Sequence, residues 1–114
     1  MAFDRNISDV ANWMNMFRWI VKLIRDEYGV DEAKLTRTAI IETDAGLTIE
    51  QTEEVFEIIA SSFQITFPPG TLDELVKLEE LCMLASWLNG LYKKPEFLGA
   101  EFAAKAMAMN PKAQ

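Results

Sequence analysis

The apolar residues between Val10 and Tyr28 recur at steps of three and four along the chain. This spacing predicts one apolar stripe on an α-helix of about 20 residues, because a half-buried strand would alternate apolar and polar residues instead. No later segment shows such an alternation, so we expect an all-α fold. The residues of the stripe are Val10, Trp13, Met14, Phe17, Ile20, Val21, Ile24 and Tyr28.

The ends of this first helix are marked by residues that commonly cap helices. Ser8 is the expected N-cap, with Asp9 in the first turn, and Gly29 can adopt the left-handed conformation that ends a helix. The helix also carries more apolar surface than one buried face requires. The apolar residues partly off the stripe are Met16, Trp19 and Leu23.

Residues 30–47 show no sustained period and are expected to form a long loop, with Ile40 and Ile41 as its anchors in the core. A loop of this length between helices usually has a function or its own packing. Glu42 and Asp44 are the one acidic pair here that is worth testing as a weak divalent-cation site, although their spacing is not that of a calcium loop.

A second helix is predicted from Thr48, which would form a capping box with Gln51 three residues later. Its end lies in the sequence ITFPPG, because neither proline continues a helix. The expected buried stripe is Thr52, Val55, Phe56, Ile59 and Phe63. The glutamates off this stripe are Glu50, Glu53, Glu54 and Glu57.

A short helix is predicted from Thr71, as an N-cap paired with Glu74, and it leads into a further helix that ends at Gly90. The apolar face of the latter is Leu78, Leu81, Cys82, Ala85 and Leu88, with Trp87 beside it. A last helix is expected over residues 96–109, with Leu98, Phe102, Ala106 and Met109 on one side. The chain is therefore expected to be a bundle of three main helices and one short helix (residues 1–94), with a C-terminal helical extension (residues 95–114).

The charge of the chain restricts its partners. Its 18 acidic and 11 basic residues give a net charge of −7, which disfavours nucleic acid as a partner because phosphate binding needs a basic face. The chain is better suited to a basic patch on another protein. The alternative is that the charge serves only solubility.

Catalytic chemistry has little support in the sequence. The chain has one cysteine, Cys82, and no histidine, so the usual triads, zinc sites and neutral-pH bases are missing. Cys82 is expected to be an inert buried thiol. A single cysteine fits a reducing compartment, and no signal peptide or membrane span is evident. We therefore expect a cytoplasmic, non-catalytic protein with no metal and no membrane association.

The order of the predicted helices and three short motifs resemble the acyl carrier protein family. IVKLIRDEYGV is similar to the end of that family's first helix, SSFQITFP to its Phe-x-x-x-Ile-Pro motif, and SWLNG to its aromatic-Ile-Asn-Gly motif. The likeness covers residues 17–92. It implies an acyl-carrier-like bundle whose second helix docks on Arg/Lys patches of partner enzymes, such as those of lipid or polyketide biosynthesis.

The family's Asp-Ser-Leu motif, whose serine carries phosphopantetheine, is altered in this chain. In a gap-free alignment Gly46 matches the family glycine, Thr48 takes the aspartate position, and Ile49 takes the serine position. Ile49 has no nucleophile and cannot be modified. If the alignment is shifted by one residue, Thr48 becomes the attachment site, although its methyl group crowds the hydroxyl.

Three hypotheses follow for function. The first is a non-catalytic, acyl-carrier-like binding module without a cofactor, which docks a basic protein through Glu50, Glu53, Glu54 and Glu57. Between Glu42 and Glu80 the chain has ten acidic residues and only one basic residue, Lys77. The second hypothesis is a specialised carrier with phosphopantetheine on Thr48. The third is an oligomerising structural protein, in which the surplus apolar surface of the first helix and the Met-rich C-terminal helix form a homodimer.

Bulky aromatic residues on the inward stripes either fill the space that an acyl chain would need or simply pack the core. They are Phe17, Phe56, Phe63 and Trp87.

Overall fold

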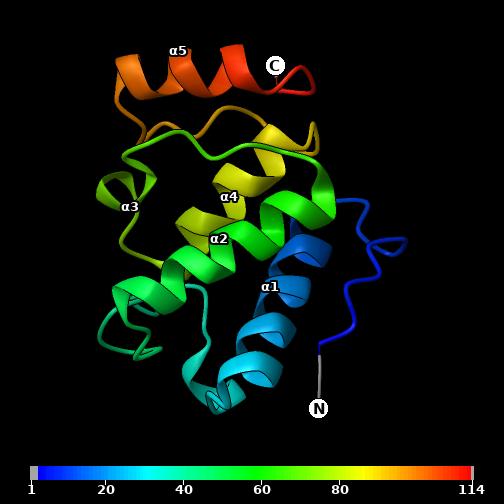
Figure 1. Ribbon diagram of the computed structural model, residues 1–114, viewed down its shortest axis with the longest axis vertical. Helices are drawn as coiled ribbons and strands as arrows, with labels where there is room; N and C mark the ends of the chain where they lie inside the picture. The colour runs from blue at the N-terminus through cyan, green and yellow to red at the C-terminus, as the bar shows by residue number, and fades with distance from the viewer. Residues whose placement is uncertain (1–2, 114) are drawn as a thin grey trace.

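The computed structural model describes residues 3–113 and shows an all-α protein. Five α-helices and one 3₁₀ turn lie within these residues, with no β-strand (Figure 1). None of these helices is long and apolar enough to cross a membrane. The elements are α1 (Trp13–Tyr28), the 3₁₀ turn (Glu32–Lys34), α2 (Ile49–Phe63), α3 (Thr71–Glu74), α4 (Leu78–Leu88) and α5 (Ala100–Met109).

The core lies where α1 packs against α4 and α2 (Figure 1). The predicted apolar faces of α2 and α4 are confirmed, since every residue named for them is buried. Trp87 is also fully buried, and the Trp19 ring meets Phe63 edge-on at 4.8 Å. These large rings occupy the interior between the helices, where close packing leaves few voids.

The predicted start of α1 is wrong. Asn12, not Ser8, is the N-cap, and its side chain accepts the backbone N–H of Asn15 at 2.9 Å. Residues 3–11 instead run beside α1, because their contacts with Trp19 hold them there. The Trp19 indole donates to the Asn6 carbonyl at 3.1 Å, and the Phe3 ring lies edge-on to it at 4.9 Å.

This N-terminal segment also changes which face of α1 is buried. Met16, Trp19 and Leu23, which lie partly off the predicted stripe, are all buried. Of the predicted stripe, only Ile20, Val21 and Ile24 are buried, while Met14 is 43% exposed. The surplus apolar surface on which the dimer hypothesis draws is therefore largely covered within the chain.

The long loop between α1 and α2 has its own packing and its own backbone pairing. Leu35, Ala39, Ile41, Ala45 and Leu47 are buried. The loop pairs with the segment that enters α4, since the Ile41 N–H donates to the Val76 carbonyl at 3.0 Å and the Leu78 N–H donates to the Ala39 carbonyl at 2.9 Å. Ile41 is thus a core anchor as predicted, but Ile40 is 38% exposed, because consecutive residues of this extended pair point to opposite sides.

The same pairing separates α3 from α4, which the sequence predicts as nearly continuous. Leu75 and Lys77 have extended backbone conformations. Thr71 is not the N-cap of α3: Gly70 takes that position, and the buried Thr71 hydroxyl donates to the Pro68 carbonyl at 2.6 Å. Glu74, the expected partner of Thr71, instead accepts the Gly99 N–H at 2.9 Å.

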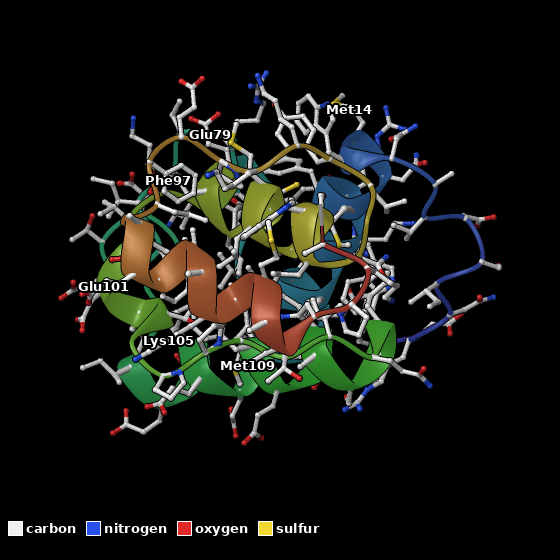
Figure 2. The ribbon with its side chains drawn as sticks, turned by 90° about the horizontal axis from the view of Figure 1, so that it is seen from above. Met14, Glu79, Phe97, Glu101, Lys105 and Met109 are labelled. Atoms are coloured by element: carbon white, nitrogen blue, oxygen red, sulfur yellow. The ribbon has the colours of Figure 1, made fainter. Side chains whose placement is uncertain are left out.

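Helix α5 lies across one end of the bundle, over the connection between α2 and α3 (Figure 1). Figure 2 looks down on this helix, with Glu101, Lys105 and Met109 labelled along it. It begins after Gly99 and not at residue 96, and it buries Ala103 and Ala106, whereas Met109, predicted to share a side with Ala106, is 41% exposed. Small alanines allow the helix to approach the connection closely.

Buried Asn110 fixes the end of α5 to that connection. Its Oδ1 accepts the Thr66 N–H at 2.7 Å, and its Nδ2 donates to the carbonyls of Thr66 and Ala106 at 2.8 Å each. The predicted extension from residue 95 therefore packs on the bundle. The outer residues of the two predicted ranges, 1–2 and 114, lie outside the described residues.

Candidate docking surface on α2

The start of α2 is held in place by the paired loop that precedes it. Asp44 Oδ2 accepts the Ile40 N–H at 2.8 Å, and the Asp44 N–H donates to the Ile40 carbonyl at 2.8 Å. Gly46 has φ +69°, a left-handed conformation that a side chain would strain. This tight turn leads into Thr48, the N-cap of α2.

The predicted capping box at Thr48 and Gln51 is present. The Gln51 N–H donates to Thr48 Oγ1 at 3.1 Å, and Gln51 Oε1 accepts the Thr48 N–H at 3.0 Å. The Thr48 carbonyl also accepts the Thr52 hydroxyl at 2.8 Å. Thr48 therefore occupies the N-cap, and its hydroxyl oxygen serves as a hydrogen-bond acceptor for the helix.

Ile49 is the first residue of α2 and points into solvent. Its side chain is 66% exposed, the largest exposure among the large apolar side chains of residues 3–113. This is the residue that the sequence resemblance predicts at the serine position of acyl carrier proteins. An aliphatic side chain at an exposed helix start contributes little to the core.

The four glutamates predicted to lie off the buried stripe are all exposed: Glu50, Glu53, Glu54 and Glu57. With 100° between successive residues of a helix, they cover the side of α2 opposite the core. Glu53 and Glu57 follow Ile49 at steps of four, so these three residues form one ridge along the helix. Glu54 lies on the other flank, toward α1.

Glu54 is partly engaged within the fold. Its Oε1 accepts the Tyr28 hydroxyl at 3.0 Å. Burial, together with this hydrogen bond to a carboxylate, raises the pKa of Tyr28 to about 12. Glu54 is therefore a contact between α1 and α2 as well as a surface charge.

The other three glutamates of α2 have no internal partner in the part of the chain that the structure describes. The three ion pairs there are Arg25–Asp26, Arg25–Glu32 and Arg37–Glu79. No basic residue lies within α2. Like charges three and four residues apart on a helix repel one another by about 0.2–0.5 kcal/mol per pair, so this arrangement opposes helix stability.

An open groove of about 850 Å³ runs along one side of α2, between the helix and the connection to α3. Its walls include Phe56 and Phe67, whose rings lie 5.1 Å apart at a tilt of 36°. Glu53, Glu57 and Arg5 are the charged residues that line it. The groove therefore combines an apolar wall with two carboxylates from α2 and one basic side chain from the N-terminal segment.

Two other residues considered in the sequence have structural roles here. Cys82 is buried beneath α1, its Sγ lies 3.2 Å from the Trp13 carbonyl, and burial raises the pKa of its thiol to about 12. Asp44 closes the loop before α2, as described above. Residues 3–113 contain no group of three or more His, Cys, Asp or Glu side chains that could hold a metal ion.

Reasoning from the sequence missed the apolar surroundings of Ile49. Leu72 and Val76, both exposed, line the same small hollow as Ile49. They come from α3 and from the segment before α4, so no local spacing could indicate that they meet. The sequence contains one signal for this site. Ile49 lies at the edge of the buried stripe of α2, four residues before Glu53, so an apolar side chain and a carboxylate are neighbours on the helix surface.

Comparison of the chain with protein families, with curated proteins and with solved structures finds no match.

Proposed function

We propose that this chain is a non-catalytic binding module, similar in plan to an acyl carrier protein, that docks a basic surface of a partner protein through α2. The observation that supports this most strongly is the uncompensated acidic side of α2. Glu50, Glu53 and Glu57 are exposed and have no internal hydrogen bond or ion pair among the described residues. Like charges that repel one another and face solvent are well placed to attract a basic partner.

Two features favour binding without a phosphopantetheine arm. Ile49 offers no nucleophile at the position of the carrier serine, and the Thr48 oxygen accepts the Gln51 N–H as part of the helix cap. The alternative hypothesis, a carrier with phosphopantetheine on Thr48, is tested by measuring the intact mass of the protein after incubation with a broad-specificity phosphopantetheinyl transferase and coenzyme A. We expect no mass gain while a serine-bearing carrier protein is fully loaded. A gain of one arm that is lost in Thr48→Ala would establish the carrier function instead.

Docking through α2 is tested with an octalysine peptide as a simple basic probe, by isothermal titration and by amide chemical shifts. The variant Glu50→Gln, Glu53→Gln, Glu57→Gln should weaken binding several-fold, and the shifts should concentrate on α2. Glu54 is kept because it bonds Tyr28.

The matched control changes the same number of charges elsewhere: Asp9→Asn, Glu96→Gln, Glu101→Gln. These three side chains are also exposed. Equal loss of affinity in the two triple variants would mean that only net charge matters, and would contradict a docking site on α2.

A further inference from the structure

Exposed apolar side chains gather at the start of α2. Single exposed apolar residues are ordinary on protein surfaces, but a cluster around a hollow marks an interaction site. Among residues 3–113, eight large apolar side chains are exposed, and four of them line one hollow of about 170 Å³. These four, the Ile49 cluster, are Ile40, Ile49, Leu72 and Val76.

The hollow has an apolar floor. Ile41, Leu47 and Leu75 lie beneath it, all buried. The backbone pairing between Ile41 and Val76 fixes two of its walls relative to each other. The site is therefore held open by the fold and does not need to be formed on binding, which lowers the cost of association.

The hollow continues into the larger groove beside α2, since Phe56 and Leu72 line both. The charged side chains of this joint surface are mostly acidic: Glu42 lines the hollow, and Glu53 and Glu57 line the groove together with one basic residue, Arg5. Along the ridge of α2, Ile49, Glu53 and Glu57 follow one another about 6 Å apart, the spacing of four residues in a helix.

We infer that the Ile49 cluster receives the apolar anchor of a basic amphipathic helix, whose Lys or Arg side chains meet Glu53 and Glu57 along the groove. This inference rests on the proposed function and specifies the chemistry of the partner. An amphipathic helix that lies along α2 can place its apolar face over the Ile49 cluster, while lysines or arginines at the border of that face reach Glu53 and Glu57.

The carboxylates around this surface disfavour two other occupants, a second copy of this chain and an anionic membrane. A second copy of this chain would bring its own carboxylates against Glu42, Glu53 and Glu57, at a net charge of −7 per copy. An anionic membrane surface would be repelled in the same way. A basic partner removes the repulsion already present on α2.

The probe is a designed 14-residue helical peptide with leucines on one face and lysines on the other. A peptide of the same composition in scrambled order, with no apolar face, is its control. Amide chemical shifts of the protein should change at the Ile49 cluster and along α2 with the amphipathic peptide. The scrambled peptide should bind about tenfold more weakly and leave the cluster unperturbed.

The decisive variant is Ile49→Asn, which removes the apolar contact without touching the core. We expect it to weaken the amphipathic peptide about tenfold or more, the effect of burying one aliphatic side chain. The matched control is Met14→Asn, because Met14 is also an exposed apolar residue in the first turn of a helix, and is 43% exposed. This control should bind like the unmodified chain.

The outcomes separate the two proposals. If Ile49→Asn has no effect while the triple glutamine variant still weakens binding, the apolar anchor is refuted and docking through the acidic side of α2 stands. If only Ile49→Asn matters, the anchor stands and the acidic docking role fails. Dimerisation of the free chain that Ile49→Asn abolishes would assign the cluster to a second copy and overturn the inference.

Discussion

At the residue scale, Thr48 and Ile49 show how two neighbouring positions divide their roles. Thr48 forms two reciprocal hydrogen bonds with Gln51 and so stabilises the start of the helix. Ile49 is available to a partner, since two thirds of its side chain is exposed. Substitutions at the two positions should therefore separate stability from binding.

Thr48→Ala removes the N-cap oxygen and should lower the free energy of unfolding by about 1 kcal/mol. Thr48→Ser keeps the hydroxyl and should stay within a few tenths of a kcal/mol of the unmodified chain. Urea denaturation measures both. Equal stability of Thr48→Ala and the unmodified chain would show that the cap bond contributes nothing.

Cys82 should make the fold sensitive to alkaline pH. Burial raises the pKa of its thiol from 9.0 to about 12, so the folded chain holds this proton more tightly than the unfolded chain. The resulting stability is complete below about pH 9 and declines as the pH rises toward about 12.

Urea midpoints taken at intervals between about pH 8 and about pH 11 should fall with pH, since the unfolded thiol ionises first. The decline should be shallower in Cys82→Ala. Tyr28, whose pKa is also raised, accounts for the part that remains. The same slope in both chains would mean that Cys82 is not the titrating group.

At the element scale, α2 is shaped by two opposing demands. Its buried stripe and capping box stabilise the helix, whereas its glutamates repel one another with no basic residue between them. The sequence predicts this element well, because both the stripe and the caps are local patterns. The hollow beside it could not be predicted, because Ile40, Leu72 and Val76 reach it from distant segments.

Glu57→Lys should stabilise the chain and weaken docking at once. The new lysine follows Glu53 by four residues, in the favourable orientation, so we expect a gain of about 0.5 kcal/mol in the free energy of unfolding. Affinity for octalysine should fall. Glu96→Lys, an exposed site off α2, should leave the helix unaffected; a matching gain in stability there would point to net charge as the cause.

Asn110→Ala should release α5 from the connection between α2 and α3. The change removes the three hydrogen bonds of the buried Asn110 side chain and should cost about 2 kcal/mol or more. Amide hydrogen exchange should then show α5 losing protection ahead of α1. Lys105→Ala, on the exposed side of α5, is the control, and a similar loss of protection there would contradict a specific role for Asn110.

The errors of sequence-based prediction in this fold share one physical cause. Ser8 and Asn12 are comparable N-caps by residue type, and the choice between them depends on Phe3 and Asn6 meeting Trp19. The same contacts bury the residues of α1 that lie off the predicted stripe. Met109 faces solvent because Ala103 and Ala106 provide the close approach. In each case a contact between distant residues outweighs the local pattern.

At the scale of the whole molecule, the net charge of −7 acts on both stability and association. Raising NaCl from about 0.05 M to about 0.5 M screens repulsion within the chain and attraction to a basic partner alike. The thermal midpoint should therefore rise while affinity for octalysine falls. The triple glutamine variant should show a smaller rise. A midpoint that falls with salt would show that ion pairs, and not repulsion, dominate.

The pairing of residues 39–41 with residues 76–78 also bears on the order of folding. It closes a loop that contains the whole of α2, and closing such a loop costs conformational entropy before later contacts offset it. The walls around Ile49 come together only when this pairing has formed. A partner that recognises those walls would bind only chains in which the pairing is in place, so that its binding would also report that this part of the fold is complete.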